Sequence, residues 1–200
     1  MRRKVFDVLA STGGLVMVVV LLVAGGLLMW GYSFANSNVH SQLAEQQISF
    51  PPQAAFAHAK AGTEITPAMK NTIYKYAGQP LTTGAQAEAY ADDFISVHLG
   101  EMPYHGVYAL VSTASRADPS NATLAAEVQT SFQGTTLRGL LLEAYAFSEF
   151  SLIALVAGLA AFALALVMAI LVAVGFWHAR KVDQDTELFA PVEERVLQDA

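Results

Sequence analysis

Two long stretches of the chain are apolar and carry no charge. No Asp, Glu, Lys, Arg or His occurs between Asp7 and His40, and none occurs between Glu149 and His178. At about 1.5 Å of rise per residue, each stretch is long enough for a helix that crosses a hydrocarbon core of about 30 Å. The pattern predicts an all-α membrane protein with two transmembrane helices, at residues 12–34 and 152–177.

The segment between the two spans is more polar and reads as two parts. Residues 35–52 are rich in Gln and Ser and end on Pro51 and Pro52, a composition that favours an extended linker. Residues 53–151 alternate short apolar patterns with turn residues, which predicts a small helical domain.

Several helix boundaries can be predicted within residues 53–151. Thr66 followed by Pro67 predicts one helix start, and Thr83 with Gln86 predicts a capping box at another. The helix after Thr83 places five residues on one face at spacings of three and four, as expected of an amphipathic core helix: Ala87, Ala91, Phe94, His98 and Leu99. Gly100 and Pro103 end it.

The C-terminal half of this domain predicts a helix that continues into the second span. Residues 105–117 form one segment, and Ser120 or Asn121 then caps a helix that reaches Phe132. Gly134 predicts a bend. From Thr136 onward no helix-breaking residue occurs before Trp177, so the last outer helix is expected to run into the membrane.

The distribution of charge orients the two spans. Basic residues precede the first span, at positions 2–4, and follow the second, at positions 180–181. Residues 1–11 and 178–200 are therefore expected to be cytoplasmic. The translocated segment has ten acidic and five basic residues, and such a surface does not suit nucleic-acid binding. We expect a bacterial plasma-membrane protein with a periplasmic central domain. The first span could instead be a cleaved secretory signal, although its apolar run exceeds the usual length of about 7–15 residues.

The second span carries a row of small residues at every fourth position. Such rows let helix backbones approach closely, and a four-residue repeat suits a right-handed crossing with a partner helix. We expect partner packing through five alanines, namely Ala157, Ala161, Ala165, Ala169 and Ala173, together with Arg138 in the outer helix.

Residues able to carry out chemistry are sparse. His98, Glu101 and His105 could converge as two imidazoles and a carboxylate, but Pro103 and Gly106 interrupt a common helix face. The sequence contains no cysteine and no phosphate-binding or nucleophile motif. We therefore predict no catalytic, cofactor-binding or metal site, and no cofactor of its own.

Several motifs resemble those of a known family. They occupy residues 78–84, 90–92, 95–99, 117–121 and, above all, residues 132–147, which read FQGTTLRGLLLEAYAF. They are similar to actinobacterial two-span membrane proteins described as possible respiratory supercomplex association factors and often labelled aromatic ring-opening dioxygenases. The resemblance implies partners in the cytochrome bcc complex and cytochrome c oxidase.

The prediction is therefore a non-catalytic accessory subunit of a respiratory supercomplex that packs through its second span and outer helices. Two alternatives stay open. A metal-dependent extracytoplasmic oxygenase would need iron bound at His98, and a membrane-tethered sensor or adaptor would act through residues 178–200, where residues 191–197 could form a short helix.

Overall fold

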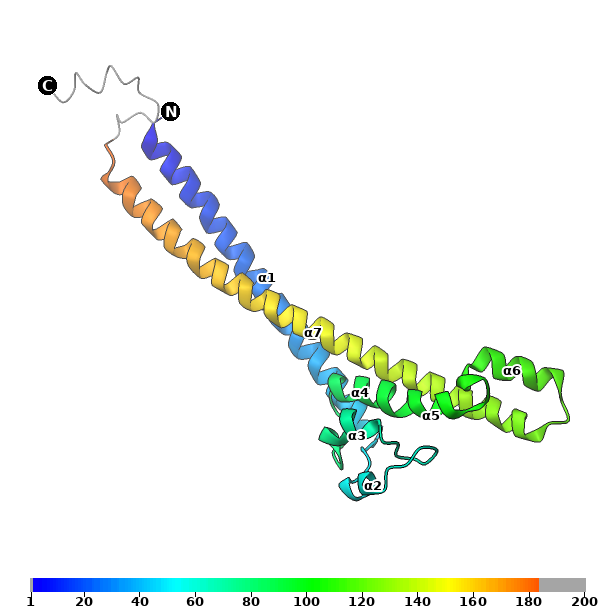
Figure 1. Cartoon of the computed structure of the whole chain (residues 1–200). Coiled ribbons are helices and arrows are strands. Elements are labelled where there is room, and N and C mark those ends of the chain that lie inside the picture. Colours follow the sequence, from blue (N-terminus) through cyan, green and yellow to red (C-terminus); the bar gives the residue numbers. More distant parts are fainter. Residues whose placement is uncertain (1, 184–200) are drawn as a thin grey trace, which may run out of the picture. The chain divides into compact units, whose positions relative to one another are not determined.

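The computed structural model describes residues 2–183, and these residues are helical almost throughout (Figure 1). The described residues form no β-strand beyond one isolated bridge between Ser49 and Pro80. In chain order the elements are α1 (Arg3–Glu45), α2 (Gln53–Ala57), α3 (Met69–Thr72), the 3₁₀ turn η1 (Tyr74–Tyr76), α4 (Gly84–Tyr90), the π-helical turn η2 (Ala91–Ile95), α5 (Ser96–Glu101), the 3₁₀ turn η3 (Pro103–Gly106), α6 (Tyr108–Ala117) and α7 (Ala122–Lys181).

The all-α prediction is confirmed, and both α1 and α7 are long and apolar enough to cross a membrane. The chain divides into two compact units. One unit comprises Met1–Gly31 and Ile153–Ala200, and the other comprises Tyr32–Leu152. We call them the span unit and the outer unit. The helix predicted at residues 191–197 lies outside the described residues.

In the span unit, α1 and α7 pack against each other along a seven-residue repeat. Figure 1 shows the two helices side by side in this unit. The buried positions recur every seven residues on both helices: Ser11, Val18 and Gly25 on α1, and Gly158, Ala165, Val172 and Ala179 on α7. A repeat of this length is typical of helices that supercoil with a left hand.

Small residues bring these two helix backbones close together. A methyl group added to Gly14 would lie 2.7 Å from Val172 Cγ2, and one added to Gly175 would overlap the Ser11 hydroxyl. At one end of the pair, His178 Nδ1 lies 2.9 Å from Asp7 Oδ2. Close apolar packing and a polar contact at one end therefore hold the span unit together.

The outer unit has a continuous hydrophobic core built from residues far apart in the sequence. Its fully buried side chains include Phe56, Met69, Ile73 and Leu81, and Leu141 of α7 completes the cluster. The short helices α2 and α3 supply Phe56 and Met69, and Tyr76 of η1 packs partly buried against the cluster. Burial rather than helix propensity therefore orders this part of the chain.

The prediction of an extended linker at residues 35–52 is wrong. α1 continues as a helix to Glu45, and two residues of the segment belong to the core, Leu43 and Phe50. The Phe50 ring lies 5.1 Å from the ring of Tyr76 and 5.3 Å from that of Tyr90. Burial of these apolar side chains outweighs the weak turn preference of the Gln and Ser residues around them.

The two predicted helix starts differ in outcome. The capping box is confirmed: Gln86 N donates to Thr83 Oγ1, and Thr83 N donates to Gln86 Oε1. The start at Thr66 is wrong, because α3 begins at Met69 without a side-chain cap. The buried Thr66 backbone N–H instead points at the sulfur of Met69 at 3.5 Å.

The amphipathic helix predicted after Thr83 is present, but its middle is wider than an ordinary α-helix. α4, η2 and α5 follow one another without a break, and Ala87 and Ala91 are fully buried. Phe94 and Leu99 pack partly buried against the same core. The π-helical turn between α4 and α5 was not predicted, since nothing in a 3.6-residue pattern signals one.

The long helix α7 confirms one prediction and corrects another. Asn121 caps it by accepting a hydrogen bond from Leu124 N at 3.1 Å, as expected, and the helix runs unbroken to Lys181. The bend predicted at Gly134 is absent. A methyl group there would lie 2.8 Å from Leu99 Cδ2, so Gly134 makes room for α5 rather than bending the helix.

Candidate functional site

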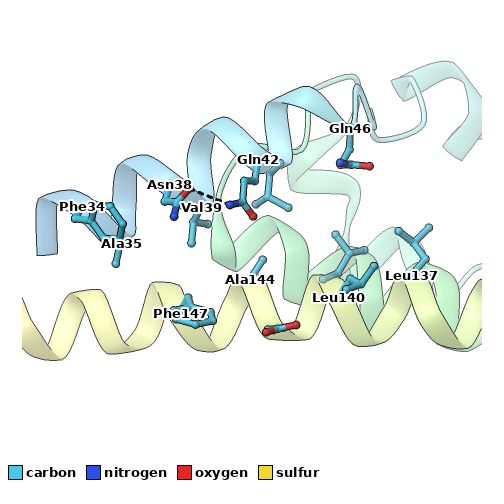
Figure 2. A pocket seen from close by; sticks show the side chains of 13 residues that line it. Phe34, Ala35, Asn38, Val39, Gln42, Gln46, Leu137, Leu140, Ala144 and Phe147 are labelled. Atoms are coloured by element: carbon cyan, nitrogen blue, oxygen red, sulfur yellow. Dashed lines mark hydrogen bonds between the residues drawn. The ribbon is translucent and has the colours of Figure 1, made fainter. Parts of the chain in front are cut away.

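A groove lies between two helices of the outer unit and has a volume of about 510 Å³. One wall is the last part of α1, from Phe34 onward, together with Gln46 just after the helix ends, and the other is the part of α7 from Leu137 to Phe147. Figure 2 shows side chains of both helices pointing into the space between them, with Phe34 and Phe147 towards one end and Gln46 and Leu137 towards the other.

The groove combines an apolar floor with a few polar groups. Leu43 and Leu141 form part of its lining and also belong to the buried core. Its polar lining consists of three amides and one carboxyl group, from Asn38, Gln42, Gln46 and Glu143. Gln42 Nε2 donates to Asn38 Oδ1 at 2.9 Å, which orders two of these amides. Mixed linings of this kind are typical of sites for small amphiphilic ligands.

A second feature of the outer unit is the kinked 3₁₀ turn η3 between α5 and α6. Tyr104 and His105 both adopt left-handed backbone conformations, with φ of 55° and 54°, which non-glycine residues rarely do. The buried Ser131 hydroxyl donates to Gly106 O at 2.6 Å and ties this turn to α7. Such strain persists only where surrounding contacts determine the backbone.

Large apolar side chains are exposed on and near this turn. We call them the outer apolar residues: Tyr104, Val107, Tyr108, Leu110 and Phe132. The rings of Tyr108 and Phe132 contact each other with centroids 5.7 Å apart, so α6 and α7 contribute neighbouring aromatic residues to this surface. Exposed clusters of aromatic residues are typical of protein-binding surfaces.

Two of the three residues considered for a metal site, His98 and His105, have other contacts. His98 Nδ1 donates to the Phe94 carbonyl at 2.7 Å, and its ring lies 4.6 Å from the Phe94 ring. His105 Nδ1 lies 3.3 Å from Gly100 O. Within residues 2–183, no three His, Cys, Asp or Glu side chains lie close enough together to hold a metal ion.

The alanine row is divided between two environments in the structure. Ala161 and Ala165 are buried in the span unit, whereas Ala169 and Ala173 are exposed and Ala157 is half-buried. The face that packs on α1 therefore follows the seven-residue repeat and not the row. Packing of a partner on the exposed members stays a prediction.

Arg138, the sixth predicted packing residue, makes an ion pair within the outer unit. Its Nη2 lies 2.6 Å from Asp92 Oδ1, which places the π-helical turn η2 against α7. Burial, followed by the Asp92 carboxylate, raises the pKa of the adjacent Asp93, while Lys75 opposes the shift. A contact between Arg138 and a partner stays a prediction.

Neither the groove nor the outer apolar residues were predicted from the sequence. The two walls of the groove are about one hundred positions apart in the sequence. Because residues 35–52 were predicted to form an extended linker, no helix was expected at one of these walls. Tyr104, Tyr108 and Phe132 carried a signal, since aromatic residues outside the two apolar stretches need a partner or a core. A scan of protein-family models, a search of curated proteins and a search of solved structures each find no match to this chain.

Proposed function

We propose that this chain is a non-catalytic accessory subunit that binds a larger membrane complex, and that this complex is a respiratory supercomplex of cytochrome bcc and cytochrome c oxidase. The observation that carries the proposal is the exposure of the outer apolar residues, with Leu110 at 52% and Phe132 at 51%. These residues lie outside the two apolar stretches of the chain, so insertion of those stretches into a bilayer would leave them in water.

The ordered backbone beneath the outer apolar residues supports this role. The hydrogen bond from Ser131 to Gly106 holds the η3 turn, with its left-handed residues Tyr104 and His105, in one conformation. A surface that is ordered before binding loses less conformational entropy on association than a mobile loop does. Such pre-organised aromatic side chains serve well as the anchors of an interface.

Membrane attachment through α1 and α7 supplies the second part of the proposal. In this arrangement the protein lies in the bacterial plasma membrane with both ends in the cytoplasm, and the outer unit lies on the periplasmic side. The exposed members of the alanine row, Ala169 and Ala173, then face lipid or a partner helix. Close approach at small residues is a common mode of helix association in membranes.

The resemblance of residues 78–147 to the actinobacterial two-span family supports the identity of the complex. The test is a mild purification through an affinity tag placed after Ala200, followed by an absorbance spectrum and identification of the co-purified proteins. We expect haem absorbance and oxidase subunits in the eluate. An eluate without haem, from membranes that contain the oxidase, would contradict the proposal.

A further inference from the structure

We propose that the groove between α1 and α7 of the outer unit binds one aminophospholipid, with the lipid ammonium group at Glu143, the phosphate at the neighbouring amides and an acyl chain along Phe34 and Phe147. This proposal concerns the isolated protein in its membrane, so it does not depend on the respiratory partner.

One end of the groove is apolar and suits an acyl chain. Phe34 is 58% exposed and Phe147 is 53% exposed, and both line the same end of the groove (Figure 2). In sequence, Phe34 ends the first predicted span and Phe147 lies five residues before the second. This end therefore belongs to the parts of α1 and α7 nearest the bilayer, where acyl chains and head groups meet.

The charge of the groove favours a head group that carries an ammonium group. Glu143 is the one charged residue among those that line the groove, and the nearby Arg138 is paired with Asp92. A ligand with a net negative head group would meet this carboxylate with no compensating cation in the lining. A zwitterion that carries an ammonium group complements it.

The amides of the groove provide donors for the lipid phosphate. Asn38 and Gln42 lie one turn apart on α1, and Gln46 follows directly after the helix ends, so the three amides lie along one wall. Each side-chain amide carries two N–H donors, and only one of those on Gln42 is used by Asn38. Neutral donors of this kind bind phosphate oxygens without needing a basic residue.

The volume of the groove and its exposed apolar side chains also suit a lipid. A volume of about 510 Å³ lies within the range of roughly 300–1,000 Å³ common to ligand sites. Phe34 and Phe147 line the groove and are both more than half exposed, so an acyl chain along them would remove two large apolar side chains from water.

Native mass spectrometry of the purified full chain tests the proposal. The protein is delipidated in detergent and offered an equal mixture of dioleoyl-phosphatidylethanolamine, dioleoyl-phosphatidylglycerol and a menaquinone. We expect retention of one phosphatidylethanolamine in preference to phosphatidylglycerol, because the two share chains and phosphate but only the former has an amine. Glu143→Gln should reduce that retention about tenfold, the effect of losing one partly exposed charged hydrogen bond.

Two variants keep this test decisive. Glu149→Gln removes an exposed carboxylate of the same helix that lies outside the groove, and it should retain the lipid as the wild type does. Phe147→Gln changes the apolar end of the groove and should weaken binding of both phospholipids. Equal retention of the two phospholipids, retention of the menaquinone instead, or unchanged retention by Glu143→Gln would each overturn the proposal.

Discussion

At the scale of single residues, Gly84 is the glycine of the outer unit whose added methyl group would come nearest to another side chain. A methyl group there would overlap the Ser148 side chain and lie 3.4 Å from the Tyr145 Cα. We expect Gly84→Ala to lower the free energy of unfolding by about 1–3 kcal/mol, the usual cost of overpacking. Thermal unfolding of the full chain in detergent, followed by circular dichroism, measures this effect.

Gly139 offers a matched control for that substitution. It lies inside α7 with no atom within 4 Å of an added methyl group. Gly139→Ala should therefore raise the free energy of unfolding by about 0.5–1 kcal/mol, because alanine loses less backbone entropy than glycine in a helix. Equal effects of the two substitutions would contradict the packing of α4 against α7.

Asp93 leads to a prediction about pH. Its raised pKa, caused first by burial and then by Asp92, means that the folded chain binds a proton more tightly there than the unfolded chain does. Stability contributed at this site therefore falls as pH rises from the ordinary carboxyl pKa through the raised value. Asp93→Asn should raise the melting temperature at neutral pH, and the gain should shrink as pH falls below that window. A gain that is independent of pH would contradict this explanation.

At the scale of secondary structure, the capping box at α4 is the local signal that the structure bears out most directly. Both of its hydrogen bonds are present. Thr83→Ala should lower the free energy of unfolding by about 1 kcal/mol. Thr130→Ala removes an exposed hydroxyl that bonds only to a carbonyl one turn earlier in α7, and it should change the melting temperature little. Similar losses for both would argue against a capping contribution.

The elements that could be predicted are those specified by neighbouring residues. The apolar runs of α1 and α7, the Thr83 cap and the Asn121 cap each depend on a few adjacent positions. The failures depend on distant contacts. Residues 35–45 are helical because Leu43 packs in a core completed by Leu141. The helix α7 continues through Gly134, where the Leu99 side chain fills the space beside the glycine.

The candidate site was less predictable than the fold for the same reason. The groove needs α1 to continue as a helix past Phe34, which the composition of residues 35–52 argues against. The seven-residue repeat of the span unit is visible in hindsight at Ser11, Val18 and Gly25. Its small members attract less attention than the alanine row, although they form the packed face.

At the scale of the whole molecule, the chain is proposed to cross the membrane twice with both ends in the cytoplasm. The absence of cysteine makes this easy to test with single introduced thiols. In intact cells a membrane-impermeant maleimide should label Ser120→Cys, which is exposed in the outer unit, but not Asp183→Cys beyond α7. Lysis should make both react. Labelling of Asp183→Cys before lysis would contradict the proposed orientation.

The central claim is that the outer apolar residues dock this subunit on a larger respiratory complex. It is tested most directly by comparing two exposed positions of the outer unit in the tagged purification, Leu110→Asp in α6 and Ala85→Asp in α4. We expect the Leu110 variant to reach the membrane but to lose most of the haem absorbance in its eluate, whereas the Ala85 variant keeps it. Equal haem recovery with both variants would contradict the claim.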